Sequence, residues 1–182
     1  GRVAVTRLLP LSISELKEDA NIDTNTLMWK GFYPGVWGDG KDPGNVYDSY
    51  VSTYLQRDVR QILNIKDLSL FQKFLTIVAS RVGNVFIASS IASELGVDYK
   101  TIQSWMSILE TSYTAFLLQP FHRNIGKRMT KTPKVYFYDV GLVCHLLGIE
   151  NEQHIKTHPL RGAIFENMVV CEMLKKKIQS RT

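Results

Sequence analysis

The feature that most constrains the fold is a pair of predicted helices, residues 89–95 and 99–112, joined by a sharp turn. Gly96 lets the chain turn, and Val97 is an apolar residue placed to hold the two helices together. Four apolar positions at helical spacing predict the buried face of the second helix: Ile102, Trp105, Met106 and Leu109. The segment therefore has the pattern of a helix-turn-helix.

Two predicted strands follow at residues 115–121 and 134–138, which are rich in Leu, Val, Phe and Tyr. Between Glu110 and Asp139 the sequence has no acidic residue, whereas it contains the basic residues Arg123, Lys127, Arg128, Lys131 and Lys134. Two strands joined by such a segment after a helix-turn-helix predict a winged helix. We therefore expect a mainly α chain with a small β wing, in which a winged helix-turn-helix is accompanied by flanking helices.

This pattern favours contact with nucleic acid, and double-stranded DNA is the expected partner. The outer face of the second helix would present side chains that can donate to phosphates and base edges: Tyr99, Lys100, Gln103 and Ser104. Because most of the positive charge lies in the wing, we expect contacts to the phosphate backbone more than reading of bases. The alternative is a solvated basic hairpin on a winged helix that docks another domain, since a fold does not determine a function.

Composition sets limits on the partners and the location. The 182 residues are 45% hydrophobic and carry a net charge of +5, which allows a buried core and favours nucleic acid or an acidic partner. The longest apolar runs, AFLL and VYFY, are too short to span a bilayer, so we expect a cytoplasmic protein without a membrane partner. Cys144 and Cys171 lack metal-site spacing and are expected to be buried, and no metal site is predicted.

The stretch at residues 31–46 concentrates glycine and proline and is interpreted as a loop or linker. Gly35, Gly40 and Lys41 match part of the GxxxxGK pattern of a phosphate-binding loop. However, Asp42 stands where a Ser or Thr must ligate magnesium, and no apolar strand precedes the glycines. We therefore do not expect nucleotide binding at this stretch.

The linker divides the chain in our interpretation. Residues 1–30 would be the remnant of a preceding ATPase module, residues 47–148 a helical and winged-helix domain, and residues 149–182 the truncated start of a C-terminal module. Helical spacing predicts an amphipathic helix at residues 47–62. It also predicts a long helix at residues 164–178, whose inward-facing residues would be Phe165, Val169 and Met173.

Six strings occur in an order that resembles the C-terminal region of prokaryotic AAA-type ATPases that carry a domain of unknown function after the ATPase core. They are GRVAVTRLLPLSISEL, GFYPGVW, YVSTYLQRDVRQILNI, LGVDYKTIQSWMSILETSY, NIGKRMTKTPKVYFYDVGLVCHLLG and HPLRGAIFENMVVCEML. The resemblance covers essentially the whole chain. The strings YLQRDV, KVYFYDVGL and FEN are more specific in combination than singly.

The resemblance implies that residues 1–16 are the tail of the ATPase module, whose phosphate-binding loop and magnesium-binding strand lie upstream. ATP and Mg would then be cofactors of the intact protein and not of this piece, and Arg2 would take part in nucleotide sensing. The family's C-terminal module is similar to restriction-endonuclease-like folds, and Glu166 matches the first metal-binding glutamate of that fold. The later strands with the remaining ligands have no counterpart before Thr182.

Three hypotheses about function follow. In the first, the chain is a non-catalytic piece of an AAA-type ATP-binding protein, and its winged helix contacts nucleic acid through the basic wing. In the second, it is a structural adaptor or oligomerisation module that docks the ATPase core of the same protein to a partner. In the third, it is an incomplete restriction-endonuclease-like domain that carries Glu166.

Overall fold

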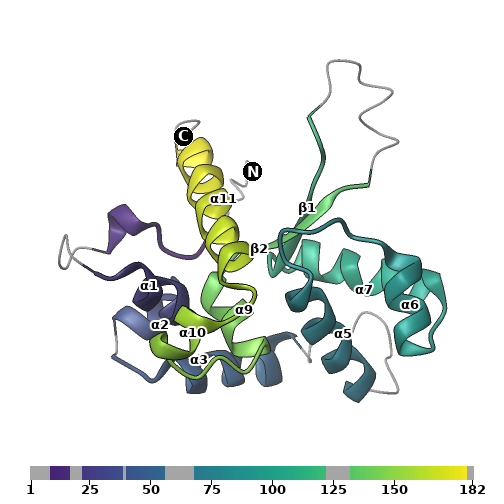
Figure 1. Ribbon diagram of the computed structural model, residues 1–182, viewed down its shortest axis with the longest axis horizontal. Coiled ribbons are helices and arrows are strands. Elements are labelled where there is room, and N and C mark those ends of the chain that lie inside the picture. Colours follow the sequence, from purple (N-terminus) through teal and green to yellow (C-terminus); the bar gives the residue numbers. More distant parts are fainter. Residues whose placement is uncertain (1–8, 17–21, 39, 56–67, 122–131, 180–182) are drawn as a thin grey trace, which may run out of the picture.

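The structure, a computed structural model, describes residues 9–16, 22–38, 40–55, 68–121 and 132–179. It is mainly helical and has a small two-stranded antiparallel sheet (Figure 1). In chain order the elements are η1 (Ile13–Glu15), α1 (Thr24–Lys30), α2 (Pro34–Trp37), α3 (Pro43–Ser49), η2 (Tyr50–Leu55), α5 (Leu68–Ser80), α6 (Ala88–Leu95), α7 (Tyr99–Thr111), β1 (Ala115–Leu118), β2 (Lys134–Phe137), α9 (Val140–Leu146), α10 (Glu152–Thr157) and α11 (Arg161–Gln179).

Helix α9 lies at the centre of the molecule. It packs against α1 and α3 from the first part of the chain and against α5, β2 and α11 from the remainder. Figure 1 shows α5, α6 and α7 on one side of α9, and α1, α2 and α10 on the other. Leu142 and Val143 of α9 are fully buried in a hydrophobic core that residues from all of these helices share. The described chain is therefore built around one continuous core.

Helices α6 and α7 meet at the turn that the sequence predicts. Gly96 follows α6 in the left-handed conformation, with φ of +67°, which a residue without a Cβ adopts without strain. Asp98 then caps α7, because its Oδ1 accepts a hydrogen bond from the Lys100 amide at 2.7 Å. The predicted inward face of α7 is confirmed, since its four members are all buried: Ile102, Trp105, Met106 and Leu109.

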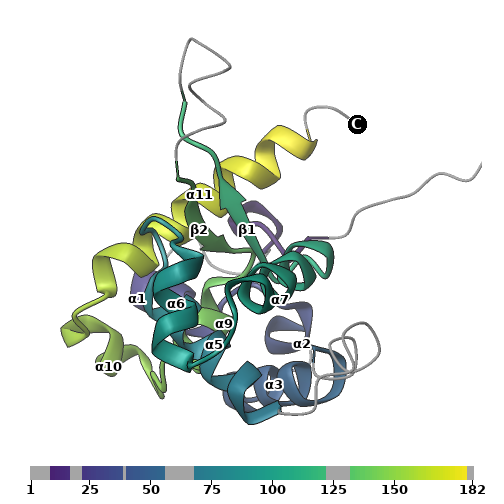
Figure 2. The same ribbon diagram turned by 90° about the vertical axis from the view of Figure 1, so that its right-hand side faces the viewer.

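The sheet follows α7 directly. β1 and β2 pair antiparallel, with Phe116 opposite Tyr136 and Leu118 opposite Lys134. Val85, in the segment between α5 and α6, forms an isolated antiparallel bridge to Lys134 on the other edge of β2. The order along the chain is therefore α5, the bridging residue Val85, α6, α7 and the β1–β2 hairpin. Figure 2 shows α6 and α7 beside this hairpin.

The segment predicted to be a linker contains two short helices, so the prediction of a loop is wrong for much of residues 31–46. Pro34 and Pro43 stand at the first helical positions of α2 and α3, where the missing amide proton of proline costs nothing. Phe32 and Val36 are buried in the common core. Proline and glycine in this stretch start and end short helices, and composition alone did not distinguish that arrangement from a loop.

The predicted helix at residues 47–62 is also divided differently. α3 already begins at Pro43, and the chain passes at Tyr50 into the π-helical turn η2. The remainder of the predicted helix lies outside the described residues. Tyr47 and Tyr50 pack with Tyr33, their ring centroids lying 5.3 Å and 5.1 Å from the Tyr33 ring. The apolar spacing thus identified the buried aromatic residues but not the helix boundaries.

The buried carboxylate of Asp139 joins three separate parts of the chain. Its Oδ1 accepts hydrogen bonds from the Tyr47 hydroxyl at 2.6 Å and the Leu142 amide at 3.0 Å, and its Oδ2 accepts one from the Phe32 amide at 2.7 Å. Complete burial raises the pKa of Asp139, and the three donors oppose that shift by favouring the charged form. The junction is tightly packed, because a Cβ on Gly31 would lie 2.1 Å from the Tyr47 hydroxyl.

Helix α11 presents a different face to the core from the predicted one. Phe165, Val169 and Met173 were expected to face inward, but they are 43%, 40% and 68% exposed. The buried residues of the helix are instead Ile164, Asn167, Met168, Cys171 and Lys175. Helix α11 has apolar residues on two sides, and Asn167 selects the buried one by bonding the backbone of β2. Its Oδ1 accepts from the Phe137 amide at 2.8 Å, and its Nδ2 donates to the Phe137 carbonyl at 3.1 Å.

Among the described residues, none of the helices is both long enough and apolar enough to cross a membrane.

Candidate functional site

The outward face of α7 is the candidate contact surface that the sequence predicts. Tyr99 is 47% exposed, and the side chains of Lys100, Gln103 and Ser104 are also exposed. Gln103 Nε2 donates a hydrogen bond to the Tyr99 hydroxyl at 2.8 Å, which links two neighbouring turns of this face. The four residues therefore lie together on one side of α7 and remain uncovered in the described part of the chain.

A groove separates this face from the base of the hairpin. It has a volume of about 380 Å³ and is lined by Phe86, Ala88, Tyr99, Gln103, Met106, Glu110, Leu117, Thr132 and Pro133. Its walls come from α7, from β1, from the segment that bridges to β2 and from the residues that precede β2. The lining combines apolar side chains with amide, hydroxyl and carboxylate groups from α7.

Lys134 and Glu166 lie on the same side of the sheet and bind each other. Lys134 Nζ is 3.0 Å from Glu166 Oε1, and the Tyr136 hydroxyl donates to the same oxygen at 2.5 Å. These hydrogen bonds, first from Tyr136 and then from Lys134, lower the pKa of Glu166. Burial and the bond to Glu166 raise the pKa of Tyr136. The charge of Lys134 is thus compensated within the chain, which weakens its predicted role as a phosphate contact.

Glu166 is the residue that the sequence resemblance matches to a nuclease glutamate. In the structure its carboxylate is engaged by Lys134 and Tyr136, at the side of the sheet. Within the described ranges, no group of three or more His, Cys, Asp or Glu side chains is arranged to hold a metal ion. The geometry around Glu166 therefore supports a structural contact between α11 and β2.

The remaining predicted site residues cannot be placed. Arg2, Arg123, Lys127, Arg128 and Lys131 lie outside the described residues, so their roles stay predictions. Only the ends of the segment that carries the last four are described, at Phe121 and Thr132.

The stretch that resembles a phosphate-binding loop does not fit a nucleotide. A helix does begin at Pro43, but the Asp42 carboxylate already occupies its N-terminus. Asp42 Oδ1 accepts a hydrogen bond from the Asn45 amide at 3.1 Å. A phosphate at this position would face a negative charge and would have to compete for that amide.

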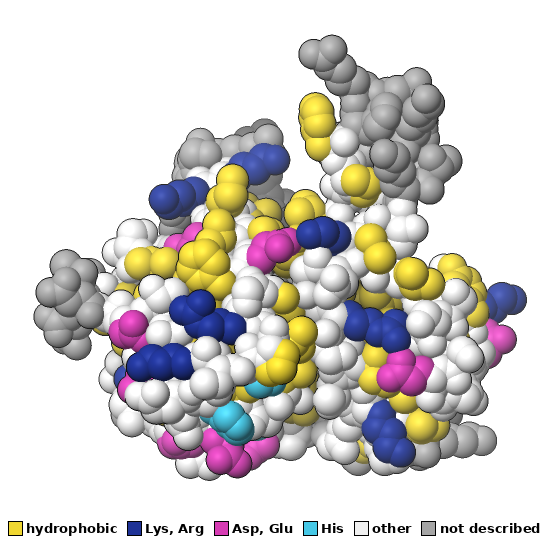
Figure 3. Space-filling view, in the orientation of Figure 1, with side chains coloured by type: hydrophobic (Ala, Val, Ile, Leu, Met, Phe, Trp, Pro, Cys, Tyr) yellow, Lys and Arg dark blue, Asp and Glu magenta, His cyan; other side chains and the backbone are white. Residues whose placement is uncertain are grey.

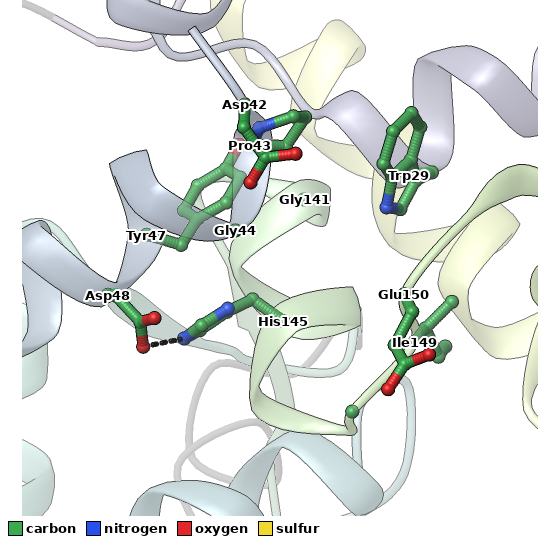
Figure 4. A pocket seen from close by; sticks show the side chains of 11 residues that line it. Trp29, Asp42, Pro43, Gly44, Tyr47, Asp48, Gly141, His145, Ile149 and Glu150 are labelled. Carbon is green, nitrogen blue, oxygen red and sulfur yellow. Dashed lines mark ion pairs between the residues drawn. The ribbon is translucent and has the colours of Figure 1, made fainter.

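A second hollow lies between α1, α3 and α9 and was not predicted from the sequence. It measures about 340 Å³ and is lined by Trp29, Asp42, Pro43, Gly44, Tyr47, Asp48, Gly141, His145, Gly148, Ile149 and Glu150 (Figure 4). His145 Nε2 lies 3.3 Å from Asp48 Oδ1 at its edge. Burial lowers the pKa of His145, and the nearby Asp48 opposes this shift. These side chains come from three distant segments, and the spacing of the residues along the sequence gives no signal of their meeting.

Comparison with known families decides how the chain is classified. Residues 21–153 match a family described as Domain of unknown function (DUF8612). The chain belongs to this family. The matched region contains α7, the groove beside it and the hollow at His145, whereas α11 with Glu166 lies beyond it.

Two curated proteins of mycobacteria are similar to the chain over nearly its whole length. They are the uncharacterized protein Mb2031c of Mycobacterium bovis and the uncharacterized protein Rv2008c of Mycobacterium tuberculosis. Each is 28% identical over 172 residues, which make up 93% of this chain and 38% of the relative. The chain thus spans well under half the length of these relatives. No solved structure matches it.

The groove beside α7 is the part of the candidate site that sequence reasoning missed. Phe86, Leu117 and Pro133 stand in three different segments, and of these only Leu117 lies in a predicted strand. The bridge from Val85 to Lys134 brings these segments together. A sequence signal could have come from the short extended stretch before α6, where the buried Phe86 stands between the exposed Val85 and Ile87.

Proposed function

We propose that α5, α6, α7 and the β1–β2 hairpin form a winged helix that contacts nucleic acid. The contact would use the exposed face of α7 and the basic segment between the two strands. The observation that supports this function best is the uncovered polar face of α7, with Tyr99, Lys100 and Gln103 beside the hairpin. A face that was buried against another element could not enter a groove of DNA.

The order of elements supports the winged-helix part of the proposal. A winged helix places a recognition helix just before a hairpin and packs both on two preceding helices. Here α7 packs on α6, and Trp105 of α7 contacts Phe71 and Phe74 of α5, with ring centroids 5.5 Å and 5.3 Å apart. The bridge at Val85 adds a third extended segment to the sheet. These contacts hold α7 with its polar face outward.

The distribution of charge indicates how the contact would be made. Lys100 is the one cation on the predicted face of α7, and Lys134 is paired with Glu166. Most of the binding energy would therefore come from the residues between the strands, namely Arg123, Lys127, Arg128 and Lys131. Cations that bind phosphates release counterions, so the affinity would fall steeply with salt and depend little on sequence.

A salt titration of binding to duplex DNA tests the proposal. We expect the triple variant Lys127→Ala, Arg128→Ala, Lys131→Ala to reduce the slope of log affinity against log salt by about three, one for each phosphate-binding cation removed. The matched control replaces three exposed lysines on other helices, Lys73, Lys156 and Lys176, and should bind as the wild type does. An equal reduction of affinity in both triple variants would mean that only net charge matters and would contradict the proposal.

We also propose that this winged helix serves a longer ATP-binding protein of the AAA type and is not itself an enzyme. The support is the order of the sequence strings, together with relatives that are more than twice as long as the matched region. ATP and Mg would bind the ATPase core of that longer protein, and the core would be a partner of the winged helix.

A second candidate function is that of a structural adaptor or oligomerisation module. It is favoured by the row of exposed apolar side chains on α11, formed by Phe165, Val169 and Met173. Figure 3 shows hydrophobic side chains gathered over this helix. Residues four apart lie on one side of a helix, so the three form a continuous stripe that a protein surface could cover.

A further inference from the structure

We infer that the groove between α7 and the hairpin takes an unpaired nucleobase that carries an exocyclic amino group, so that the chain prefers single-stranded nucleic acid. This inference rests on the proposed contact with nucleic acid and specifies its substrate. It goes beyond the winged helix itself, whose usual surface is the outer face of the second helix and not a groove behind it.

The groove has the dimensions and walls of a base-binding pocket. At about 380 Å³ it has room for one nucleobase and part of its sugar, whereas a base in a duplex would first have to be unpaired and unstacked. Phe86, Met106, Leu117 and Pro133 give it apolar surfaces. Unpaired bases bind proteins chiefly through such surfaces, because their faces are poorly hydrated.

Tyr99 supplies an aromatic ring at the mouth of the groove. The side chain is 47% exposed, which leaves the ring accessible, and the Gln103 amide holds its hydroxyl at 2.8 Å. Stacking of a base on an exposed aromatic ring is a common source of affinity for single strands and tolerates any base. Tyr99 would therefore contribute binding without selecting among bases.

Glu110 supplies the selection. Its Oε1 accepts a hydrogen bond from the Leu117 amide at 3.3 Å, and its Oε2 has no hydrogen-bond partner among the described residues. An ionised carboxylate can only accept hydrogen bonds, so it pairs with the amino groups of cytosine, adenine and guanine. Thymine and uracil offer a carbonyl at the corresponding position, which the carboxylate repels. The groove thus favours cytosine over thymine.

The charge of the adjoining sequence favours nucleic acid as the occupant of the groove. Thr132 and Pro133, which line it, directly follow the segment with Arg123, Lys127, Arg128 and Lys131. Cations so close in the sequence would attract the phosphates attached to a bound base. An apolar peptide would gain nothing from that charge.

Binding of labelled oligo(dC), oligo(dT) and duplex DNA, measured by fluorescence anisotropy at one salt concentration, tests the inference. We expect oligo(dC) to bind about tenfold more tightly than oligo(dT), since one selective contact to a base edge has about this effect. Oligo(dC) should also bind more tightly than the duplex. Equal affinity for oligo(dC) and oligo(dT) would overturn the inference, while duplex binding that remained salt-dependent would leave the proposed winged-helix function intact.

Variants separate the two roles in the groove. Glu110→Gln should bring the ratio of oligo(dC) to oligo(dT) affinity close to one, and the ratio is unaffected by any general change in charge. Tyr99→Ala should lower the affinity for both oligonucleotides about tenfold, whereas Tyr99→Phe should keep most of the affinity because it keeps the ring.

Phe165→Ala is the control: it removes a similarly exposed ring on α11 and should change neither affinity. Thermal unfolding checks that each variant is folded. An unchanged ratio in folded Glu110→Gln would refute the assignment of Glu110.

Discussion

Single side chains of α11 hold this helix to β2, and Glu166 is the most exposed of the α11 residues that do so. Its Oε1 receives hydrogen bonds from both Lys134 and Tyr136, while the neighbouring Asn167 binds the backbone of Phe137. Cys171 also donates to the Phe137 carbonyl, at 2.8 Å. The string FEN therefore encodes two contacts to the same strand, one at the surface and one in the core. A role in packing accounts for its glutamate without a metal.

The lowered pKa of Glu166 predicts a specific dependence on pH. A carboxyl group whose pKa is lower in the folded state stabilises the protein above its ordinary pKa of 4.5 and loses this effect as pH falls through the folded value. The free energy of unfolding should thus differ between wild type and Glu166→Gln at neutral pH, and the difference should shrink below pH 4.5. Urea unfolding at a series of pH values measures it.

The control for this experiment is Glu150→Gln, which makes the same change of charge. Glu150 is exposed, and its side chain forms no hydrogen bond among the described residues. If the difference between wild type and Glu166→Gln were constant down to strongly acidic pH, the contacts of Glu166 with Tyr136 and Lys134 would not exist in solution.

The two apolar sides of helix α11 have different surroundings. The buried side meets β2 and the N-terminal residues: Lys175 Nζ donates to the Leu11 carbonyl at 2.6 Å and lies 4.3 Å from the centre of the Phe32 ring. Glu172 accepts from the Ile13 amide at 3.0 Å. The other side carries the stripe of Phe165, Val169 and Met173. One helix thus binds both β2 and the N-terminal residues and still offers an uncovered surface.

Substitutions on the stripe test the adaptor function at the level of this helix. The double variant Val169→Lys, Met173→Lys should change the free energy of unfolding by no more than about 0.5 kcal/mol, because both residues are exposed. If the stripe is a docking surface, the variant should lose association that the wild type shows in sedimentation velocity, alone or with the unmatched region of a longer relative.

The control for this pair adds the same two charges away from α11. Gln72→Lys on α5 and Gln153→Lys on α10 both replace exposed side chains, so the control has the same net charge as the stripe variant and an intact stripe. It should associate as the wild type does. Association that persisted in the Val169 and Met173 variant, or that was absent in the wild type, would argue against the adaptor function.

The molecule as a whole is held by a core that crosses the predicted domain boundary. Met28 of α1 is fully buried, and its carbonyl accepts a hydrogen bond from Cys144 of α9 at 3.3 Å. Asp139 binds Phe32 and Tyr47 across the same boundary. The family match also spans it, from residue 21 to residue 153. Helix α1 is therefore packed as an integral part of the fold around α9.

This packing predicts cooperative unfolding. We expect Met28→Ala to lower the free energy of unfolding by about 2–5 kcal/mol, since it removes a large side chain from a filled core. The decrease should appear equally in tryptophan fluorescence and in far-ultraviolet circular dichroism during urea unfolding, because α1 and α7 unfold together. Lys30→Ala, at the partly exposed end of the same helix, is the matched control. Two separate transitions would instead support the predicted division at residues 31–46.

The sequence by itself determined the local parts of this protein. The turn at Gly96, the buried face of α7 and the antiparallel pairing after it depend on glycine conformation and on apolar spacing within a few residues. Sequence patterns failed where they were compatible with two different local structures. The apolar residues of α11 allowed either side to be buried, and the proline-rich stretch allowed either a loop or short helices.

Only the tertiary structure decided these cases, because each depends on groups that are far apart in the chain. Asn167 determines which side of α11 is buried, because its side chain forms hydrogen bonds with the amide and the carbonyl of Phe137, thirty residues away. Asp139 fixed the path of residues 31–47 by accepting hydrogen bonds from Phe32 and Tyr47. The groove beside α7 likewise exists because the Val85 bridge brings Phe86 next to Pro133. Buried polar groups need hydrogen-bond partners, and these partners can lie far away in the sequence. The spacing of residues within one segment does not predict which distant residue will be the partner.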